Sequence, residues 1–403
     1  MTTSVIRAGG TGVAGVQTTG GDDGALSLKV GPLSTTVEAL SITSAGAATL
    51  ASTLAVTSDL TANNFAGKNR IINGAMMVDQ RNAGAAVTAA NAYPVDRWYI
   101  SNTANGSYSA QQVSDTPVGF SSSLKVTVTA AQTANTGNLA PVQLIEGNNI
   151  ADLGWGAAGA KTVTLSFWVR SSLTGTFGGS LRNSASNRSY PVTYTISVAD
   201  TWEYKTITIA GDTSGTWLTT NGVGIRVRFS LYAVASSLQS AGTWYAGSAT
   251  GATGQTQLAS TNGATFYITG VQLEKSSTAT EFEYRPYGTE LALCQRYFQQ
   301  WGGNSGNERI GNGFNYSTTQ ARVDMVLPVT MRAAPTVSSP DVTKWAVEGS
   351  GYAPDCTAIA VDQPSTKIAA INFTVASGLT AGQGVHIMAS SDAAARLLLS
   401  AEL

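Results

Sequence analysis

Apolar and polar residues alternate along several segments in the middle of the chain. In TVTLSFWVR (162–170), every second residue is large and apolar: Val163, Leu165, Phe167 and Val169. The same period runs through 224–233, 204–211 and 123–130. A period of two with a polar opposite face predicts antiparallel strands that pack on one side only. Several such strands joined by Gly/Ser/Asn loops predict a β-sandwich over residues 68–288.

One predicted strand changes its phase part of the way along. In TFYITGVQLE, Phe266 and Ile268 share one phase, whereas Val271 and Leu273 follow one residue late. Gly270 stands at the break. An extra residue at a glycine within a strand predicts a β-bulge.

The first 67 residues have a different texture. They contain no Trp or Tyr, and their short alternating runs, such as Leu40/Ile42 and Leu54/Val56, are separated by small residues. Strands this short cannot close a core within one chain. Three chains around one axis would bury these faces together, so we expect residues 1–67 to form the stalk of a homotrimer. The alternative is a flexible Gly/Ala/Ser linker.

A helical stripe follows the predicted sandwich. Apolar residues at helical spacing run from about Gly288 to Trp301, and Gly302-Gly303 supplies a stop: the stripe is Leu291, Cys294, Phe298 and Trp301. We therefore predict a helical connector over 289–301. Residues 302–403 contain further strand-like runs (322–329 and 367–375) and are predicted to form a C-terminal β-sandwich-like tip domain. The predicted fold class is mainly β.

Composition narrows the class of protein. Only 12% of the residues are charged, against about 25% in an ordinary soluble domain. With 8 Trp, 14 Tyr and 10 Phe the chain can bury cores, which argues against disorder. The net charge of −1 gives no electrostatic footprint for nucleic acid. No apolar run reaches the length of a membrane-spanning helix, so no membrane insertion is expected.

The start of the chain, MTTSVIRAGGTG, lacks the apolar region of a secretory signal. A surface-like protein without such a signal fits a particle that is assembled in the host cytoplasm and released by lysis. An ordinary cytosolic protein would fit as well.

Few residues suit catalysis or cofactor binding. The single histidine, His386, lies in a strand-like run, and no nucleophile elbow, phosphate loop or zinc ligand set occurs. Cys294 and Cys356 are expected to be free thiols. We expect no cofactor, no metal site and no enzyme activity. Glycoside hydrolysis needs only two carboxylates, and its candidates are Glu146, Asp152, Glu274, Glu281 and Glu283.

Three segments carry a resemblance to a known family. They are KNRIINGAMMVDQRNAGAAVT…YPVDRWYI (68–100), VQLIEGNNIADL…KTVTLSFWVRSS (142–172) and FYITGVQLEKSSTATEFEYRPYGTELALCQRYFQQW (266–301). In this order they resemble tail-fibre and tail-tip receptor-binding proteins of bacteriophages. The resemblance implies that residues 68–288 form a jelly-roll domain similar to a carbohydrate-binding module. It also implies that residues 1–67 are a virion anchor that attaches to phage tail or baseplate proteins, and that the C-terminal domain is the outer tip.

Strand phase also places certain residues opposite the predicted core. These residues are Trp168, Arg226, Arg228, Tyr232 and Tyr267. Aromatic faces and bidentate side chains suit sugars, so we predict that the five form an exposed glycan platform. The alternative is that this face packs against a neighbouring subunit or against the helix 289–301. Asp96 and Arg97, beside Trp98, are predicted to be structural.

These patterns lead to one expected function. The chain is expected to be a tail-fibre or tip protein of the virion that binds host surface glycan, such as lipopolysaccharide, at several weak sites at once. The alternatives are a purely structural virion connector, and a detached carbohydrate-binding module or adhesin.

Overall fold

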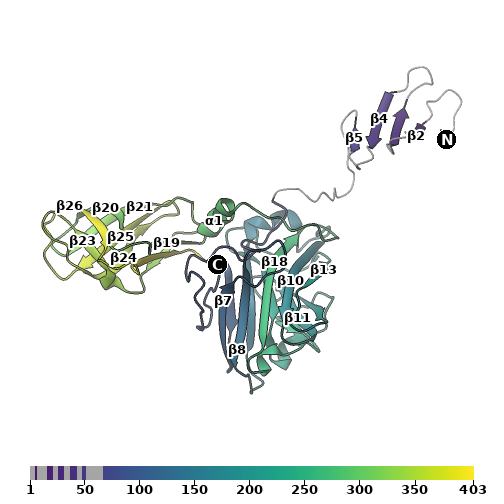
Figure 1. Cartoon of the computed structure of the whole chain (residues 1–403), viewed down its shortest axis with the longest axis horizontal. Helices are drawn as coiled ribbons and strands as arrows, with labels where there is room; N and C mark the ends of the chain where they lie inside the picture. The colour runs from purple at the N-terminus through teal and green to yellow at the C-terminus, as the bar shows by residue number, and fades with distance from the viewer. Residues whose placement is uncertain (1–4, 7–15, 21–25, 31–36, 43–47, 51–66) are drawn as a thin grey trace. The chain divides into compact units, whose positions relative to one another are not determined.

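The computed structural model describes residues 5–6, 16–20, 26–30, 37–42, 48–50 and 67–403. The chain divides into two compact units, residues 1–61 and residues 62–403 (Figure 1). Strands dominate both units, which confirms the predicted mainly-β fold class. No helix in the described part of the chain is long and apolar enough to cross a membrane.

The first unit is a five-stranded antiparallel meander in which each strand pairs with the next. Its strands are β1 (Val5–Ile6), β2 (Val16–Gly20), β3 (Leu26–Val30), β4 (Val37–Ile42) and β5 (Ala48–Leu50). The short alternating run at Leu40/Ile42 is therefore a strand, as predicted. The run at Leu54/Val56 lies outside the described residues. The ladder joins strands of one chain, and the homotrimer stays a prediction.

Residues 98–274 form a sandwich of two antiparallel sheets, which we name by their strands β10 and β14. The β10 sheet consists, in spatial order, of β13 (Glu203–Ile209), β10 (Val163–Ser171), β18 (Thr265–Glu274), β8 (Ser123–Ala130) and β7 (Ser107–Val113) (Figure 1). The β14 sheet consists of β12 (Ser189–Ile196), β11 (Gly175–Arg182), β14 (Val223–Ser230) and β9 (Asn138–Glu146), with β15 (Tyr232–Ala233) and β6 (Trp98–Asn102) also paired to β9.

The core of the sandwich lies between these sheets. Phe167 of β10 and Phe229 of β14 meet edge to face with ring centroids 4.9 Å apart. The apolar residues that alternate in 162–170 are all buried there, as the period of two predicted. Gly270 adopts φ +61°, and the β10–β18 register shifts between Ser166 and Trp168, so the predicted β-bulge is confirmed.

Short elements connect these strands. Two of them pair in parallel, β16 (Leu238–Gln239) and β17 (Gly251–Ala252). The 3₁₀ turns between these strands are η1 (Gly147–Asn149), η2 (Ala151–Leu153), η3 (Ala235–Ser237) and η4 (Leu258–Ser260), whereas η5 (Val342–Lys344) lies in the C-terminal part.

The helix is shorter than the sequence pattern predicted. Helix α1 spans Tyr287–Gln295, and β19 begins three residues later at Phe298–Gly302. The prediction of a helix over 289–301 was therefore wrong in its second half. The reason is tertiary: β19 pairs with β27 along its whole length, so its backbone groups bond across a sheet and not along a helix. Gly302 and Gly303, at φ +78° and +90°, end a strand.

The C-terminal part has its own core between two further antiparallel sheets. The smaller sheet consists of β19, β27 (Arg396–Ser400) and β22 (Thr336–Ser338). The larger sheet runs β23 (Trp345–Glu348), β26 (Gly384–Ala389), β20 (Arg309–Asn315), β21 (Gln320–Val326), β25 (Ile368–Val375) and β24 (Cys356–Pro364). This arrangement is the β-sandwich-like domain that was predicted, with β19 added to it.

Buried ion pairs join the two sandwiches. Glu402, just beyond β27, pairs with Arg81 at 2.9 Å and also with Arg97. Asp96 accepts from Arg81 at 3.1 Å, and both Asp96 and Arg97 are almost fully buried. Removing one partner of a buried ion pair is strongly destabilising, because it leaves an uncompensated charge away from water. Asp96 and Arg97 therefore have structural contacts, as predicted.

Candidate functional site

The five residues of the predicted glycan platform do not share one face. Trp168 and Tyr267 lie in the β10 sheet, whereas Arg226, Arg228 and Tyr232 lie in the β14 sheet. Four of them occupy strand positions that alternate with the core, as their phase indicated, whereas Tyr232 belongs to the core cluster itself, contrary to the prediction. The outer faces of the two sheets of a sandwich point in opposite directions, however, so a single platform was wrong.

Two of these residues are occupied by contacts within the chain. Tyr232 is buried, and its hydroxyl donates to the Ala134 carbonyl at 2.8 Å. The Tyr267 ring is buried beneath Arg170 and Lys125, which lie 5.0 and 5.4 Å from its centroid. Neither ring offers an open face, and their role in ligand binding stays a prediction.

Trp168, in contrast, lies in a groove on the outer face of the β10 sheet. The groove has a volume of about 680 Å³, which is the size range of small-ligand sites. Its aromatic lining consists of Phe120, Trp168, Tyr204 and Phe282. We call this hollow the aromatic groove.

Strand register brings the groove floor together. Tyr204 lies opposite Trp168 in the β13–β10 ladder, and their ring centroids are 5.4 Å apart. Thr206 and Thr208 continue the same face of β13, because they follow at every second position. Tyr204 is 42% exposed, so the floor offers an open aromatic surface beside a row of hydroxyls.

The segment after β18 folds back to form a wall of the groove. The Thr164 hydroxyl donates to the Ser276 carbonyl at 2.9 Å, and the Thr208 hydroxyl donates to the Ser277 carbonyl at 3.1 Å. Buried Glu274 holds the next turn by accepting from the Thr280 backbone at 2.8 Å. The wall is therefore fixed to the sheet by hydrogen bonds at both of its ends.

Phe120 reaches the groove from the loop between β7 and β8. Its ring meets Phe282 of the wall edge to face at 5.2 Å. A Cβ placed on Gly270 would stand only 2.7 Å from Phe120 and 3.1 Å from Trp168. The bulge therefore makes room, by lacking a side chain, for the two rings to approach the strand.

The groove has the chemical features that a sugar needs. Flat aromatic faces contact the apolar C–H faces of a pyranose ring. The hydroxyls of Thr206 and Thr208, together with the exposed carboxylate of Glu281, offer hydrogen-bonding partners for sugar hydroxyls. The site contains no buried charge that would require a charged ligand.

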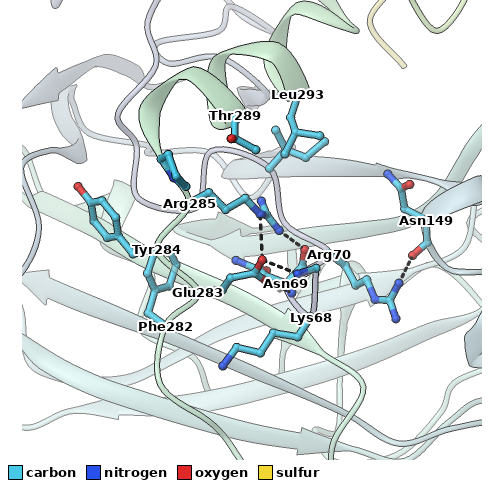
Figure 2. A pocket seen from close by; sticks show the side chains of 13 residues that line it. Lys68, Asn69, Arg70, Asn149, Phe282, Glu283, Tyr284, Arg285, Thr289 and Leu293 are labelled. Carbon is cyan, nitrogen blue, oxygen red and sulfur yellow. Dashed lines mark hydrogen bonds and ion pairs between the residues drawn. The ribbon is translucent and has the colours of Figure 1, made fainter. Parts of the chain in front are cut away.

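A second hollow, of about 780 Å³, lies between the segment 67–70, the segment 282–286 and helix α1. Figure 2 shows Arg285 pointing at Glu283 and Asn69, and Arg70 pointing at Asn149. Glu283 accepts from the Asn69 backbone at 2.7 Å and from Gly67 at 2.6 Å. Burial alone would raise the pKa of Glu283, but these bonds and the Arg285 guanidinium outweigh it and lower the pKa. These groups fasten the chain, and we assign no ligand to this hollow.

The other carboxylates that were candidates for glycoside hydrolysis also have internal partners. Glu146 accepts from Arg296 at 2.6 and 2.9 Å, and from the Tyr297 hydroxyl at 2.7 Å. Asp152 accepts from Arg70 at 2.8 Å. Of the five candidates, Glu281 alone lines the aromatic groove.

The chain's cysteines and histidine contribute little to a site. Cys294 and Cys356 are both free and buried. Burial raises the pKa of the Cys356 thiol to about 12, which leaves it protonated and unreactive. His386 lies in β26, and its Nδ1 is 2.7 Å from the Asn312 side-chain oxygen. No group of three metal-ligating side chains occurs among the residues that the structure describes.

Sequence reasoning identified Trp168 but missed its neighbours. Tyr204 could have been found, because the alternation through 204–211 places it opposite the core with Thr206 and Thr208. Phe120 and Phe282 lie in loops, where no period indicates direction.

Comparisons with known proteins give weak structural likenesses only. No protein-family model and no curated protein matches the sequence. The enzymatically active domain of tailspike protein 4 of bacteriophage CBA120 is 14% identical, with a TM-score of 0.28 over 51% of this chain and 21% of that chain. A family 11 carbohydrate-binding module from Clostridium thermocellum, in complex with a mixed-linked tetrasaccharide, is 14% identical, with a TM-score of 0.25 over 50% of this chain and 99% of that chain. The match to the tailspike thus spans about a fifth of that protein's length.

Proposed function

We propose that this protein binds glycan in the aromatic groove, without catalysis. The observation that carries the proposal is the pair Trp168 and Tyr204, whose rings lie 5.4 Å apart on an open sheet face beside two threonine hydroxyls. A tilted aromatic pair of this kind offers two neighbouring stacking surfaces for consecutive sugar rings. Open grooves suit internal stretches of a polysaccharide, because the chain can extend beyond both ends.

Binding without catalysis is supported by the surroundings of the carboxylates. A glycosidase needs two carboxyl groups at a set separation on either side of the scissile bond. In the aromatic groove only Glu281 is available, while Glu274 and Glu283 accept hydrogen bonds from the protein itself. A lone carboxylate can orient a sugar but cannot act as both acid and base.

The proposed setting is a phage tail fibre or tip that attaches the virion to its host. The resemblance of residues 68–301 to tail-fibre and tail-tip proteins supports this setting, and so does the β-meander that precedes the sandwich. In this proposal the N-terminal unit anchors a homotrimer to tail or baseplate proteins, after assembly in the host cytoplasm. Three weak glycan sites on one fibre then give avidity by effective concentration.

The test is a comparison of three proteins on bacterial surface polysaccharides. Binding of the full chain is first located on an array that includes lipopolysaccharides, and the affinity for the best neutral oligosaccharide is then measured by calorimetry. We expect Trp168→Ala to weaken binding about tenfold or more, because stacking on a central aromatic dominates such sites. Tyr316→Ala, which removes an exposed tyrosine of the C-terminal sandwich, is the matched control and should leave affinity unchanged.

Two results would count against the proposal. Unchanged affinity in Trp168→Ala would exclude the aromatic groove as the site. Lost self-association in the same variant, with no glycan bound by the parent protein, would instead assign this face to a subunit contact and favour a structural connector.

A further inference from the structure

Three arginines gather on the outer face of the β14 sheet, away from the aromatic groove. Arg182 of β11 lies directly opposite Arg226 of β14, and Arg228 follows two residues along the same strand. Their neighbours Leu181, Val227 and Phe229 are in the core, so the three side chains leave the sheet on the same side. We call them the arginine cluster.

The cluster has no acidic partner in the part of the chain that the structure describes. Its hydrogen bonds go to neutral oxygens: Arg182 to the Ser248 hydroxyl at 2.8 Å, Arg226 to the Ser184 carbonyl at 3.1 Å, and Arg228 to the Asn138 amide oxygen at 2.6 Å. The Nε of each of the three arginines is buried without a hydrogen-bond partner.

Two other arginines of this chain have acidic partners. Buried Arg97 pairs with Glu402, and half-buried Arg188 forms a bidentate pair with Asp212, with bonds of 2.8 and 2.6 Å. Within the described residues, the arginine cluster is thus a place where buried guanidinium groups meet one another and not a carboxylate. Like charges brought together out of water repel, and the low dielectric strengthens that repulsion.

Because the cluster is buried, the repulsion between its like charges destabilises the folded state. Arg228 is 4% exposed and Arg182 is 7% exposed. Burial, followed by the neighbouring Arg182, lowers the pKa of Arg228 to about 9. Burial, followed by Arg226, lowers the pKa of Arg182 to about 10. At neutral pH both groups remain charged, and a bound anion would relieve their repulsion.

We propose that the arginine cluster is a binding site for the oxyanion of an acidic glycan, such as the carboxylate of a uronate or a sulfate ester. A guanidinium fork matches the paired oxygens of these groups, and the cluster places three such side chains on one face of the β14 sheet. Arg226 and Tyr99, which lie beside the two buried arginines, are half-buried, so the cluster borders on solvent at these two residues. The Ser184, Ser186 and Ser248 side of the cluster supplies polar groups for the hydroxyls of the sugar.

This inference goes beyond the aromatic groove, which needs no charge on its ligand. It predicts two separate sites on opposite faces of one sandwich: one for the flat faces of neutral sugars and one for an anionic substituent. Failure of one site would therefore leave the other intact.

The test measures anion-dependent stabilisation of the full chain. Thermal unfolding is followed in sodium sulfate and in sodium glucuronate, with sodium chloride at the same ionic strength as the control. Glucose in sodium chloride is the control for the uncharged part of glucuronate. A specific anion should raise the melting temperature of the parent protein above the chloride control, because it binds the folded state alone. Calorimetry with glucuronate then gives the affinity directly.

The informative variant is Arg228→Gln, which removes a buried unpaired charge. We expect it to melt at or above the temperature of the parent in chloride, and to bind glucuronate about tenfold more weakly. The rise in its melting temperature in sulfate should fall to the rise that sulfate gives any folded protein by being excluded from the protein surface. Arg309→Gln is the matched control, since its guanidinium is 57% exposed and paired with Glu348.

Each of the following results would support or overturn the arginine cluster as a site for an acidic glycan. If sulfate and glucuronate each raise the melting temperature of Arg228→Gln as much as that of the parent, the proposed site is overturned. A response to sulfate without one to glucuronate would overturn its assignment to an acidic glycan. Should Arg228→Gln fail to fold, Arg226→Gln provides the same measurement at a half-buried position. Binding of a neutral oligosaccharide should be the same in all of these variants, which separates this test from that of the aromatic groove.

Discussion

At the scale of single residues, Gly270 combines a left-handed backbone with a crowded environment. Its φ is +61°, and an added Cβ would stand 2.7 Å from the Phe120 ring. We predict that Gly270→Ala lowers the free energy of unfolding by about 2 kcal/mol and weakens glycan binding, because both φ strain and displaced rings contribute. Urea unfolding and calorimetry measure the two effects.

Gly263 offers the matched control for that experiment. It has φ +77°, but nothing lies within 4 Å of its ideal Cβ. Gly263→Ala should therefore cost only the backbone strain, about 1 kcal/mol, and leave the affinity for glycan unchanged. Equal losses of stability and affinity in the two variants would show that the bulge does not shape the aromatic groove.

At the scale of elements, the end of helix α1 is attached to the sandwich by the buried carboxylate of Glu146. Glu146 at the end of β9 accepts hydrogen bonds from Arg296 and Tyr297, directly after the helix. Burial would raise the pKa of Glu146, but the hydrogen bonds from Arg296, Tyr297 and Asn148 outweigh it, and the pKa is lowered. The carboxylate is therefore more acidic in the folded state than in the unfolded chain.

That shift predicts a pH dependence with a definite sign. A carboxylate with a lowered folded-state pKa stabilises the fold above its unfolded pKa, and this stabilisation is lost as the pH falls through the folded value. Glu146→Gln should thus cost about 2 kcal/mol at neutral pH. The difference from the parent should shrink as the pH falls below the ordinary pKa of glutamate and through the lowered folded-state pKa, as measured by urea unfolding. A difference that is constant with pH would contradict this assignment.

The elements themselves were largely predictable, and the errors have a common cause. Alternation located β10, β14, β18 and β21 because large apolar residues that face the core recur at every second position in each of these strands. The same alternation cannot tell which sheet a strand joins, so Trp168 and Arg228 were placed on one face when they lie on opposite ones. The helix was overextended because a stripe that includes Phe298 suits a helix, whereas pairing with β27 decides in favour of a strand.

The candidate site was predictable only as far as it lies on strands. Trp168 follows from its position between Phe167 and Val169 in an alternating run. The wall around Phe282 is held by side chain–backbone hydrogen bonds from Thr164 and Thr208, which join residues far apart in sequence. The isolation of the arginine cluster from carboxylates is likewise a property of tertiary structure, because the sequence contains as many acidic as basic residues to within one.

At the scale of the whole molecule, Glu402 links the C-terminal sandwich to the first one. It pairs with Arg97, which is 2% exposed, and with Arg81. We predict that Glu402→Gln lowers the free energy of unfolding by about 3 kcal/mol, since it leaves a buried guanidinium without its counter-charge. In calorimetry, the two sandwiches should then melt at more widely separated temperatures.

The control for that variant is a carboxylate in an exposed pair. Glu348 pairs with Arg309, whose side chain is mostly solvent-accessible, at 2.7 Å. Glu348→Gln should change stability by less than about 1 kcal/mol. If Glu402→Gln and Glu348→Gln have equal effects, the ion pairs at Glu402 do not couple the two sandwiches.

The proposed fibre depends on what the N-terminal unit does between chains. Its strands pair within one chain, and none is longer than six residues. Such a narrow meander cannot bury much apolar surface alone, so association with other copies would supply the missing core.

We predict that the full chain is a trimer in solution and that a protein of residues 62–403, which form a compact unit of their own, is a monomer. Light scattering after size exclusion measures both masses. A monomeric full chain would remove the avidity on which attachment by weak sites relies, and a trimeric 62–403 would move the assembly contacts to the sandwiches.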